Sequence, residues 1–351
     1  MDKRTFIKTL GLGIATLPLT AGGRAGGQQA SLAGTDSRRA STRPVPIHPL
    51  TIKPGDTIGV ITPSSPLADD EGYAIAEANI KALGLQLRWG KNVGKRNGYL
   101  AGTDEERIAD LHAMFADPAV KAIVCLRGGS GAGRLLDKLD YDLIARNPKI
   151  FMGYSDITAL HQAIFTQTGL VTFHGAVANS RWTDMVFRQF RQLFFDGRPP
   201  VFADNQGSVR IITPGAVEGT LLGGNLTVLT GIAGSRYYPD FTDSILFIEE
   251  IGEEPYRIDR MFSQLALSGA LQQIKGFVFG RCTDCEASDP RSSLPVDRII
   301  DHYIKPLGIP AYQGALIGHM DEQFILPVGA RVCMDANQGT MTVMENIFAA
   351  G

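Results

Sequence analysis

The feature that most constrains the fold is the alternation of short apolar runs with helical patterns over residues 51–195. Apolar runs such as Thr57–Pro63, Ala122–Leu126 and Val171–Gly175 have the length of buried strands. Between them, apolar residues recur every three to four positions, which indicates helices. Strands that alternate with helices predict an open, mostly parallel α/β sheet. The continuous run Ala122–Leu126 suits a strand that is covered on both faces.

The composition changes after Phe195. Residues 196–215 include the segments Asp196–Pro200 and Asn205–Gly207, which are typical of a linker between domains. Residues 216–351 contain a strand-like run at Ser244–Ile248 and a terminal hairpin pattern around Asn337-Gln338-Gly339. The sequence therefore predicts an N-terminal α/β domain at 51–195 and a second, more β-rich C-terminal domain at 216–351.

Residues 1–33 have the features of an export signal. A basic segment, Lys3–Lys8, precedes a mildly apolar stretch at Leu10–Ala21, well short of the roughly 20 residues that a membrane span needs. The pattern is similar to a twin-arginine signal in which Lys3 replaces the first arginine. Residues 34–50 are rich in small residues, Arg and Pro, and predict a disordered linker. We expect export to the periplasm without stable membrane insertion after signal removal, with a cytoplasmic location as the alternative.

The net charge and the cysteine content limit the classes of function further. The net charge is -2, which gives no electrostatic basis for binding nucleic acid. Cys282 and Cys285 have the spacing of a metal or redox site, but no second Cys/His pair of matching spacing accompanies them, and a structural zinc needs about four ligands. We interpret both as small buried or half-buried side chains, with a disulfide after export as the alternative. We expect no metal and no cofactor.

The segment Gly153-Tyr154-Ser155-Asp156 lies between the apolar run Lys149–Met152 and a pattern typical of a helix. A serine in a tight strand-to-helix turn has its hydroxyl at the sheet edge, close to the positive end of the helix, which suits a nucleophile. The same position also suits an ordinary helix N-cap. The usual elbow signature Gly-x-Ser-x-Gly is incomplete because Ile157 stands at the second glycine.

A glycine-rich segment, Gly128–Gly133, follows the apolar run Ala122–Leu126. Its backbone amides are suited to binding an anion. A phosphate loop requires Lys-Ser/Thr where Arg134-Leu135 stands, which argues against nucleotide binding. The segment can instead offer amides to an oxyanion. Because it follows a strand, as Ser155 does, both belong at the carboxyl edge of the sheet.

A nucleophilic serine needs a general base, and the base needs an orienting acid. His174 and His319 are both candidate bases, since each follows an apolar run in a presumed loop. Glu249 and Glu250 are both candidate acids, since they directly follow the run Ser244–Ile248. The residues alone thus predict a serine hydrolase without choosing between these candidates.

Taken in order, these motifs resemble the LD-carboxypeptidase family of serine peptidases, which includes peptidases that confer immunity to microcin C. The resemblance covers nearly all of the chain after about Ile52. It rests on eight short motifs in the expected order: Thr62-Pro63-Ser64-Ser65, Tyr99-Leu100-Ala101-Gly102-Thr103, Leu126-Arg127-Gly128-Gly129, Gly153-Tyr154-Ser155-Asp156, His174-Gly175, Gly223-Gly224-Asn225-Leu226, Ile248-Glu249-Glu250 and Gly318-His319.

The resemblance implies a role for each member of a catalytic triad. Ser155 is the expected nucleophile, Glu249 the acid and His319 the base, in preference to His174. Because Ser155 belongs to the first domain and the other two to the second, the resemblance implies a site in the cleft between the domains.

The resemblance also implies an oxyanion hole made by the backbone amides of Gly129 and Asp156. Arg127 is a candidate for binding a substrate carboxylate, or for packing beside the glycine-rich loop. Ser130 stands where relatives often have a bulkier residue, which bears on local specificity.

The activity that the resemblance implies is removal of the terminal D-alanine from a murein tetrapeptide stem, by cleavage of an L-to-D amide bond. The expected partner is a murein peptide, and a homodimer is compatible with the sequence. Two alternatives stay open: a peptidase of the same family that inactivates a peptidyl-nucleotide antibiotic, and a non-enzymatic murein-binding protein. The export signal argues against the first, since such antibiotics are disarmed in the cytoplasm.

Overall fold

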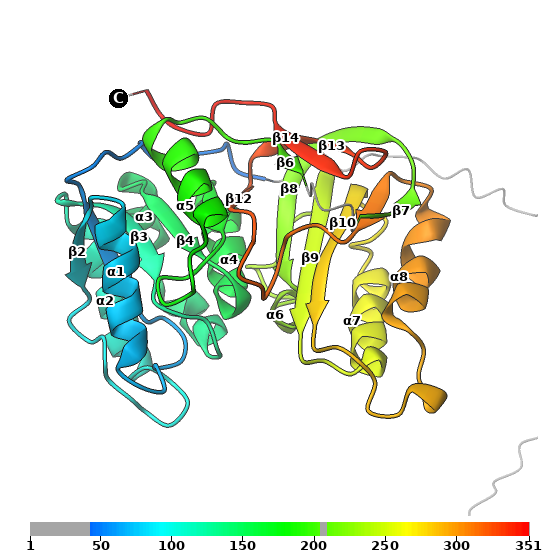
Figure 1. Cartoon of the computed structure of the whole chain (residues 1–351), viewed down its shortest axis with the longest axis horizontal. Coiled ribbons are helices and arrows are strands. Elements are labelled where there is room, and N and C mark those ends of the chain that lie inside the picture. Colours follow the sequence, from blue (N-terminus) through cyan, green and yellow to red (C-terminus); the bar gives the residue numbers. More distant parts are fainter. Residues whose placement is uncertain (1–42, 204–208, 351) are drawn as a thin grey trace, which may run out of the picture. The chain divides into compact units, whose positions relative to one another are not determined.

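The computed structural model describes residues 43–203 and 209–350, which form two sheets with their helices (Figure 1). The predicted export signal and most of the predicted linker that follows it lie outside the described residues. In the described part of the chain, no helix has the length and apolar character needed to cross a membrane.

The first sheet has six strands in the order β12-β5-β4-β3-β1-β2. Its first five strands in sequence run parallel, and β12 pairs antiparallel with β5 at the edge. Their bounds are β1 (Thr57–Ile61), β2 (Gln86–Trp89), β3 (Val120–Cys125), β4 (Ile150–Gly153), β5 (Thr172–His174) and β12 (Leu326–Val328). The long apolar runs become the central strands because both faces of this sheet are covered.

Helices cover both faces of the first sheet (Figure 1). Helices α1 (Glu71–Ala82) and α5 (Asp184–Phe190) pack on one face, and α2 (Asp104–Ala116), α3 (Tyr141–Arg146) and α4 (Thr158–Thr168) pack on the other. The predicted capping box opens α2: Thr103 accepts from the backbone of Glu106, and the Glu106 side chain accepts from the Thr103 amide.

The second sheet has eight strands in the order β6-β14-β13-β8-β9-β10-β11-β7. Strands β8 to β11 run parallel at its centre, and the outer pairings are antiparallel. The bounds are β6 (Phe202–Ala203), β7 (Arg210–Thr213), β8 (Ala216–Asn225), β9 (Ser244–Ile251), β10 (Ile274–Thr283), β11 (Ala311–Gln313), β13 (Arg331–Asp335) and β14 (Thr340–Val343). Strands β13 and β14 form the predicted terminal hairpin.

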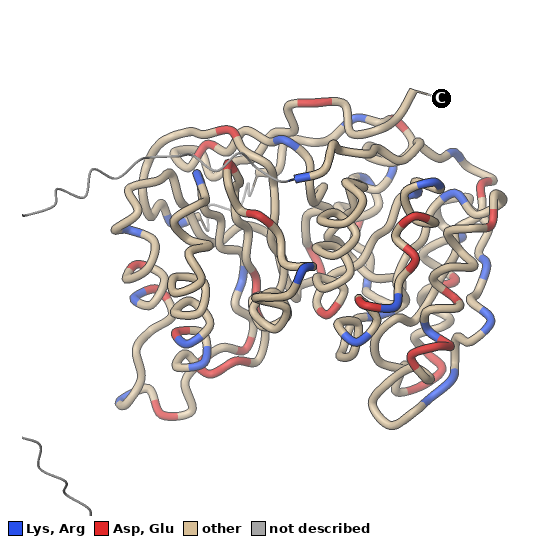
Figure 2. Tube along the Cα trace, turned by 180° about the vertical axis from the view of Figure 1, so that it is seen from behind, with Lys and Arg blue, Asp and Glu red and all other residues tan. Residues whose placement is uncertain are grey.

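Three helices pack with the second sheet: α6 (Leu226–Gly231), α7 (Pro255–Leu267) and α8 (Val296–Ile304). Pro255 is the first residue of α7, where the fixed φ of proline suits a helix and its missing N–H costs nothing. The predicted fold class, a mostly parallel α/β domain followed by a more β-rich domain, is confirmed. Lysine, arginine, aspartate and glutamate are interspersed along both domains (Figure 2).

Parts of the two segments predicted as linkers form regular backbone pairings in the structure. Within the predicted disordered linker, Ile47 bridges to Leu170, and its amide donates to the carbonyl of Gly169 at 2.8 Å. Strands β6 and β7 lie within the predicted interdomain linker. Strands β6 and β7 form the two edges of the second sheet, and Ile47 forms an isolated bridge. A composition rich in turn residues does not reveal either kind of pairing.

The C-terminal residues return to the first sheet. Strand β12 adds to β5, and the ring of Phe348 stacks on that of Phe173 with their centroids 6.0 Å apart. After the predicted interdomain linker, the chain therefore crosses between the two sheets again on either side of β12 and after β14.

Candidate active site

The candidate site lies where parallel strands of both sheets end. In the first sheet, Ser155 follows β4 and the loop Arg127–Gly131 follows β3. In the second, Glu249 lies near the end of β9, and His319 lies in the loop between β11 and β12. Side chains at the carboxyl ends of parallel strands share one edge, which is where α/β proteins bind ligands.

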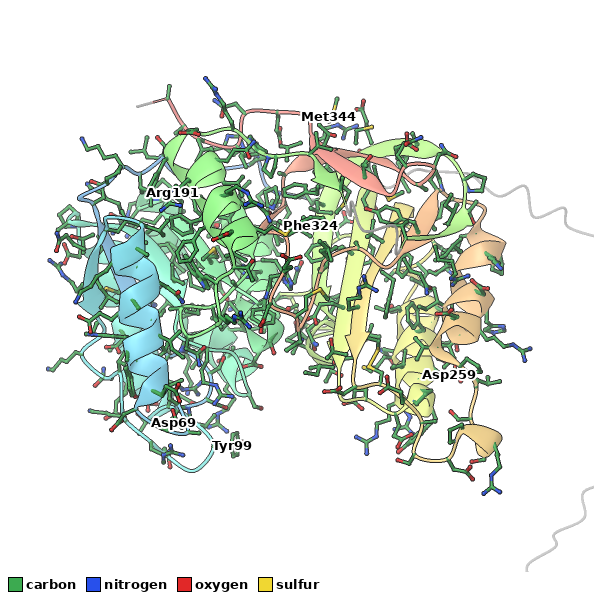
Figure 3. All side chains as sticks on the ribbon, in the orientation of Figure 1. Asp69, Tyr99, Arg191, Asp259, Phe324 and Met344 are labelled. Atoms are coloured by element: carbon green, nitrogen blue, oxygen red, sulfur yellow. A yellow bond between two sulfur atoms is a disulfide. The ribbon has the colours of Figure 1, made fainter. Side chains whose placement is uncertain are left out.

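A cavity of about 690 Å³ opens between these loops. Ser155, Gly129 and Arg127 line it from the first domain, and His319 and Ile251 line it from the second. Asp69, in the loop after β1, also lines the cavity, and Figure 3 labels it at the lower end of the first domain. The loops thus bring residues from both domains to one cavity.

Ser155 occupies a strained turn. Its φ is 64°, a left-handed conformation that costs a residue other than glycine on the order of 1–3 kcal/mol. The N-cap of the short 3-10 helix Ser155–Ile157 is Tyr154, and the N-cap of α4 is Ile157, so Ser155 caps neither helix. The turn is tight against Gly128, where a Cβ atom would lie 2.9 Å from the Cβ of Ser155. The ordinary N-cap interpretation is therefore wrong.

His319 and Glu249 form a hydrogen-bonded pair. The His319 Nδ1 lies 2.8 Å from the Glu249 Oε2, and the Glu249 side chain is fully buried. A carboxylate only accepts, so Nδ1 donates; in the neutral form of the imidazole, Nε2 is then the acceptor that a general base requires. The ring of Tyr154, directly before Ser155, lies 4.8 Å from the imidazole between ring centroids.

Gly318 allows the pair to form. Its φ is 127°, and a Cβ atom at this position would lie 3.1 Å from the Cβ of Glu249 and 3.2 Å from its Oε2. A larger residue would be strained and would press against the carboxylate. The glycine of the Gly-His motif therefore serves the close approach of the loop to β9.

Glu250 has a different environment from its neighbour. Its carboxylate accepts from the Asn225 side chain at 2.9 Å, from the Thr227 amide at 2.7 Å and from the Ile251 amide at 2.9 Å. Burial raises the pKa of this carboxyl. Glu250 therefore holds the turn between β8 and α6, while Glu249 faces the histidine.

The other candidate base, His174, is buried beside the site and does not line the cavity. Burial lowers its pKa well below the usual value, and neither ring nitrogen has a hydrogen-bond partner within the described chain. Its ring packs edge-on against Phe247. His161 is also internal: Nε2 donates to the Gly153 carbonyl at 2.8 Å, and Nδ1 accepts from Thr172 at 2.9 Å.

The glycine-rich loop is held against the loop after β1. Gly129 has a φ of 114°, and a Cβ there would clash with Ser65, whose hydroxyl accepts from the Ser130 amide at 3.0 Å. The fully buried Arg107 donates to the carbonyls of Pro63, at 2.5 Å, and of Gly131, at 3.0 Å. This arginine ties the two loops together.

Asp156 and Arg127 have additional structural contacts. The Asp156 carboxylate is buried and accepts from the Ala132 amide at 2.8 Å, which joins the serine turn to the glycine-rich loop. The half-buried Arg127 donates to the Pro66 carbonyl at 3.0 Å and also lines the cavity. Arg127 therefore both packs beside the glycine-rich loop and lines the cavity.

The structure has the alternative that was predicted for the cysteines. Cys282 is half-buried and Cys285 is buried, as expected, and the two form a disulfide across the end of β10. The two-residue spacing brings the Cα atoms within 5.6 Å because Asp284 turns the chain with a φ of 53°. In the described ranges, no group of three or more His, Cys, Asp or Glu side chains could hold a metal ion.

Sequence patterns predicted the candidate site residues but not several of the residues that contact them. Tyr154, Gly318 and Thr283 contact the His319 loop or its carboxylate partner. Gly318 carried a usable signal, a glycine beside a candidate base. Arg107 did not, since an arginine three residues after Asp104 also suits an exposed helix pair.

Comparison with known proteins identifies the family. The model of the LD-carboxypeptidase N-terminal domain matches residues 58–175, and that of the C-terminal domain matches residues 218–334. The chain belongs to the LD-carboxypeptidase family. A probable murein peptide carboxypeptidase of Bacillus subtilis is 40% identical over 307 residues, covering 85% of this chain and 95% of the relative.

Solved structures of the LD-carboxypeptidase family agree with the fold. A muramoyltetrapeptide carboxypeptidase from Oxalobacter formigenes is 31% identical with a TM-score of 0.72, covering 81% of this chain and 97% of that one. MccF in complex with glutamyl sulfamoyl guanosine is 25% identical with a TM-score of 0.80, covering 87% of this chain and 100% of that one. Membership in the LD-carboxypeptidase family supports a peptidase.

Proposed function

We propose that this protein is a serine LD-carboxypeptidase that releases the terminal D-alanine from murein tetrapeptide stems. The observation that carries the proposal is the hydrogen-bonded pair of Glu249 and His319 at the cavity that Ser155 also lines. The likeness to relatives named as carboxypeptidases of murein peptides and muramoyltetrapeptides supports the substrate class.

In the proposed reaction, Ser155 Oγ attacks the carbonyl carbon of the scissile amide while His319 Nε2 takes its proton. The tetrahedral intermediate collapses when His319 returns that proton to the leaving nitrogen of D-alanine. Water then hydrolyses the acyl-enzyme with the same histidine as base. Glu249 holds the required tautomer and stabilises the imidazolium that forms at each step.

The contact between Ser155 and His319 forms in the substrate complex. Among the described residues, no hydrogen bond joins the two side chains, although both line the cavity. Catalytic hydrogen bonds are often long before substrate binds, and they shorten in the reacting complex.

The amides of Gly129 and Asp156 are the proposed oxyanion donors. Gly129 lines the cavity, and the buried Asp156 carboxylate fixes the turn that carries its own amide. A donor of this kind typically contributes about 2.7–4 kcal/mol to transition-state stabilisation. Arg127, which lines the same cavity, is the proposed partner of the substrate carboxylate.

The proposed location is the periplasm. The disulfide between Cys282 and Cys285 supports this proposal, since disulfides persist in oxidising compartments and are rare in the cytosol. A murein substrate is consistent with that location.

A second candidate function is cleavage of a peptidyl-nucleotide antibiotic. The likeness to MccF bound to glutamyl sulfamoyl guanosine, at a TM-score of 0.80, favours it. This reaction would use the same residues on a different leaving group, so the two functions differ in substrate and not in mechanism.

Mass spectrometry of the products separates the two functions. Purified protein is incubated with a murein tetrapeptide that ends in D-alanine, with the same peptide ending in L-alanine, and with glutamyl sulfamoyl adenosine. Loss of one alanine from the D-terminal peptide alone supports the murein proposal. Turnover of the sulfamoyl adenosine alone would support the second function, and turnover of the L-terminal peptide at an equal rate would contradict LD specificity.

A further inference from the structure

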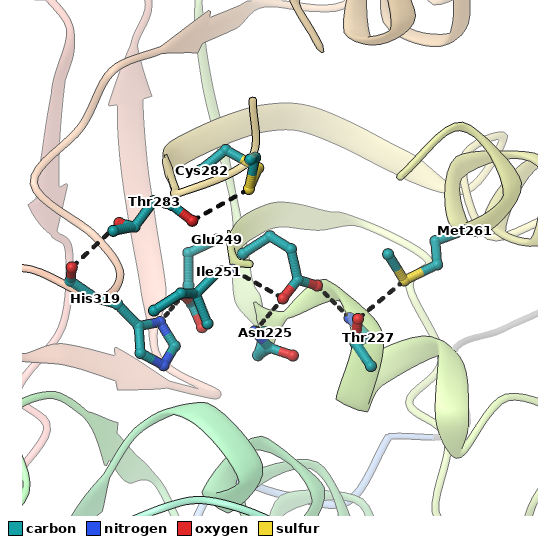
Figure 4. The surroundings of a disulfide bond; sticks show 10 residues. Asn225, Thr227, Glu249, Ile251, Met261, Cys282, Thr283 and His319 are labelled. Atoms are coloured by element: carbon teal, nitrogen blue, oxygen red, sulfur yellow. Dashed lines mark hydrogen bonds and ion pairs between the residues drawn. A yellow bond between two sulfur atoms is a disulfide. The ribbon is translucent and has the colours of Figure 1, made fainter. Parts of the chain in front are cut away.

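The disulfide closes a turn that contacts the base of the proposed triad. Cys282 and Cys285 flank Thr283 and Asp284 at the carboxyl end of β10. The Thr283 hydroxyl donates to the backbone carbonyl of His319 at 3.1 Å (Figure 4). The side chain within the disulfide loop thus holds the backbone of the residue whose imidazole bonds to Glu249.

The same turn contacts the strand that carries the acid. The Gly252 amide donates to the Thr283 carbonyl at 2.8 Å. Strand β10 pairs with β9 in a register that sets Cys282 against Glu250 and Thr283 against Ile251. Thr283 is therefore bonded on one side to the loop of the base and on the other to the end of the strand that holds the acid.

We propose that the Cys282–Cys285 disulfide and Thr283 position His319 for catalysis. The proposal rests on the function proposed above, because it assigns His319 the role of base. The disulfide fixes the turn, the turn fixes the Thr283 hydroxyl, and the hydroxyl fixes the His319 backbone against Glu249. Reduction leaves the turn free to open, and turnover falls. Thr283 is a positioning residue and does not touch substrate.

The disulfide is open to a small reductant. It lines a second cavity of about 520 Å³, separate from that of Ser155 and walled by apolar side chains such as Phe279, Leu294 and Val296. Cys282 is half-buried and Cys285 is buried. A thiolate of an added dithiol attacks one sulfur and forms a mixed disulfide. The second thiolate of the dithiol then displaces the cysteine, which leaves two protein thiols and an oxidised, cyclic reductant.

The test is a cycle that combines the redox state with the Thr283→Val substitution. Steady-state D-alanine release is measured for oxidised and for dithiothreitol-reduced protein, in the wild type and in Thr283→Val. We expect either change alone to lower kcat by about three- to tenfold, as for loss of one hydrogen bond, with KM unchanged. Reduction and the Thr283→Val substitution together lower kcat no further than either change alone, because both act through one contact.

Two variants serve as controls. Thr283→Ser keeps the hydroxyl and retains the kcat of the oxidised wild type. The Cys282→Ser/Cys285→Ser protein has the kcat of the reduced wild type and does not respond to dithiothreitol, which assigns the redox effect to this pair and not to Cys125 or Cys333. Circular dichroism at the assay temperature verifies that each protein is folded.

The inference is overturned if Thr283→Val keeps the wild-type kcat, or if reduction slows Thr283→Val as much as the wild type. The comparison of oxidised with reduced wild type needs no substitution. It therefore still tests the inference if a variant does not fold. Activity that survives Ser155→Ala would overturn the proposed function itself. Activity that depends on Ser155 but not on the disulfide would overturn this inference alone.

Discussion

Replacing Glu249 by glutamine tests the hydrogen-bonded pair of Glu249 and His319. The substitution keeps the size of the side chain and removes its charge. At the observed 2.8 Å, and with an effective dielectric constant of about 20, an imidazolium and a carboxylate attract each other by about 6 kcal/mol. That attraction corresponds to a factor of about ten-thousand in rate, close to the effect of neutralising the orienting carboxylate in Ser-His-Asp triads. We expect kcat to fall by about a thousand- to ten-thousandfold, with KM nearly unchanged.

Glu250→Gln is a matched control. It is the same change at the adjacent residue of β9, and this carboxylate accepts from Asn225, Thr227 and Ile251 instead of from the histidine. We expect it to lower the free energy of unfolding by about 1–3 kcal/mol, since an amide cannot satisfy all three donors. Its folded form should retain kcat within a few-fold. Continuous assay of D-alanine release, with urea unfolding of both variants, gives the comparison. Equal losses of kcat in the two variants, or a loss below tenfold in Glu249→Gln, would refute the assignment of Glu249.

Three further predictions concern neighbouring residues. Gly318→Ala should lower kcat by roughly ten- to a hundredfold, because a φ of 127° and contact with Glu249 cost about 1–3 kcal/mol; an unchanged kcat in folded protein would contradict this. Arg127→Ala should raise KM about tenfold or more for a peptide with a free carboxylate, but not for its C-terminal amide; equal effects on both would argue against carboxylate binding. Burial lowers the pKa of His161 to about 4. Between the usual pKa of histidine and about 4, the unfolded chain therefore binds more protons than the folded chain. The free energy of unfolding thus falls with falling pH, by up to about 1.4 kcal/mol per pH unit. Urea unfolding at pH 7, 5.5 and 4.5 should show a shallower decline for His161→Gln, and parallel declines would disprove it.

Much of the fold follows from local patterns. The alternation of apolar runs and helical segments predicts the parallel sheet, and Thr103 with Glu106 predicts the start of α2. The ordered segment 43–50 and edge strands β6 and β7 could not be predicted in the same way. Their order comes from pairing with distant strands, which local composition does not encode.

Only part of the candidate site could be predicted from the sequence. Both His174 and His319 follow apolar runs, and only the fold shows that His174 is buried in the core while His319 lines the cavity. Glu249 and Glu250 differ for a simpler reason, since side chains of consecutive residues in a strand point to opposite faces. Which face meets the histidine depends on the loop between β11 and β12, far along the chain.

The disulfide, too, could not be predicted from local sequence alone. The spacing of Cys282 and Cys285 allows a metal site, a redox pair or two separate thiols. The choice depends on Asp284, whose positive φ closes the turn at the end of β10. Aspartate tolerates that conformation better than most residues, but its presence alone does not predict it.

The most direct measurement of the central claim is D-alanine release from a murein tetrapeptide by the wild type and by Ser155→Ala, at equal concentrations of folded protein. Loss of the nucleophile of such a triad lowers kcat on the order of a million-fold. The account predicts that Ser155→Ala releases no alanine above the uncatalysed background. Release at the wild-type rate would contradict it.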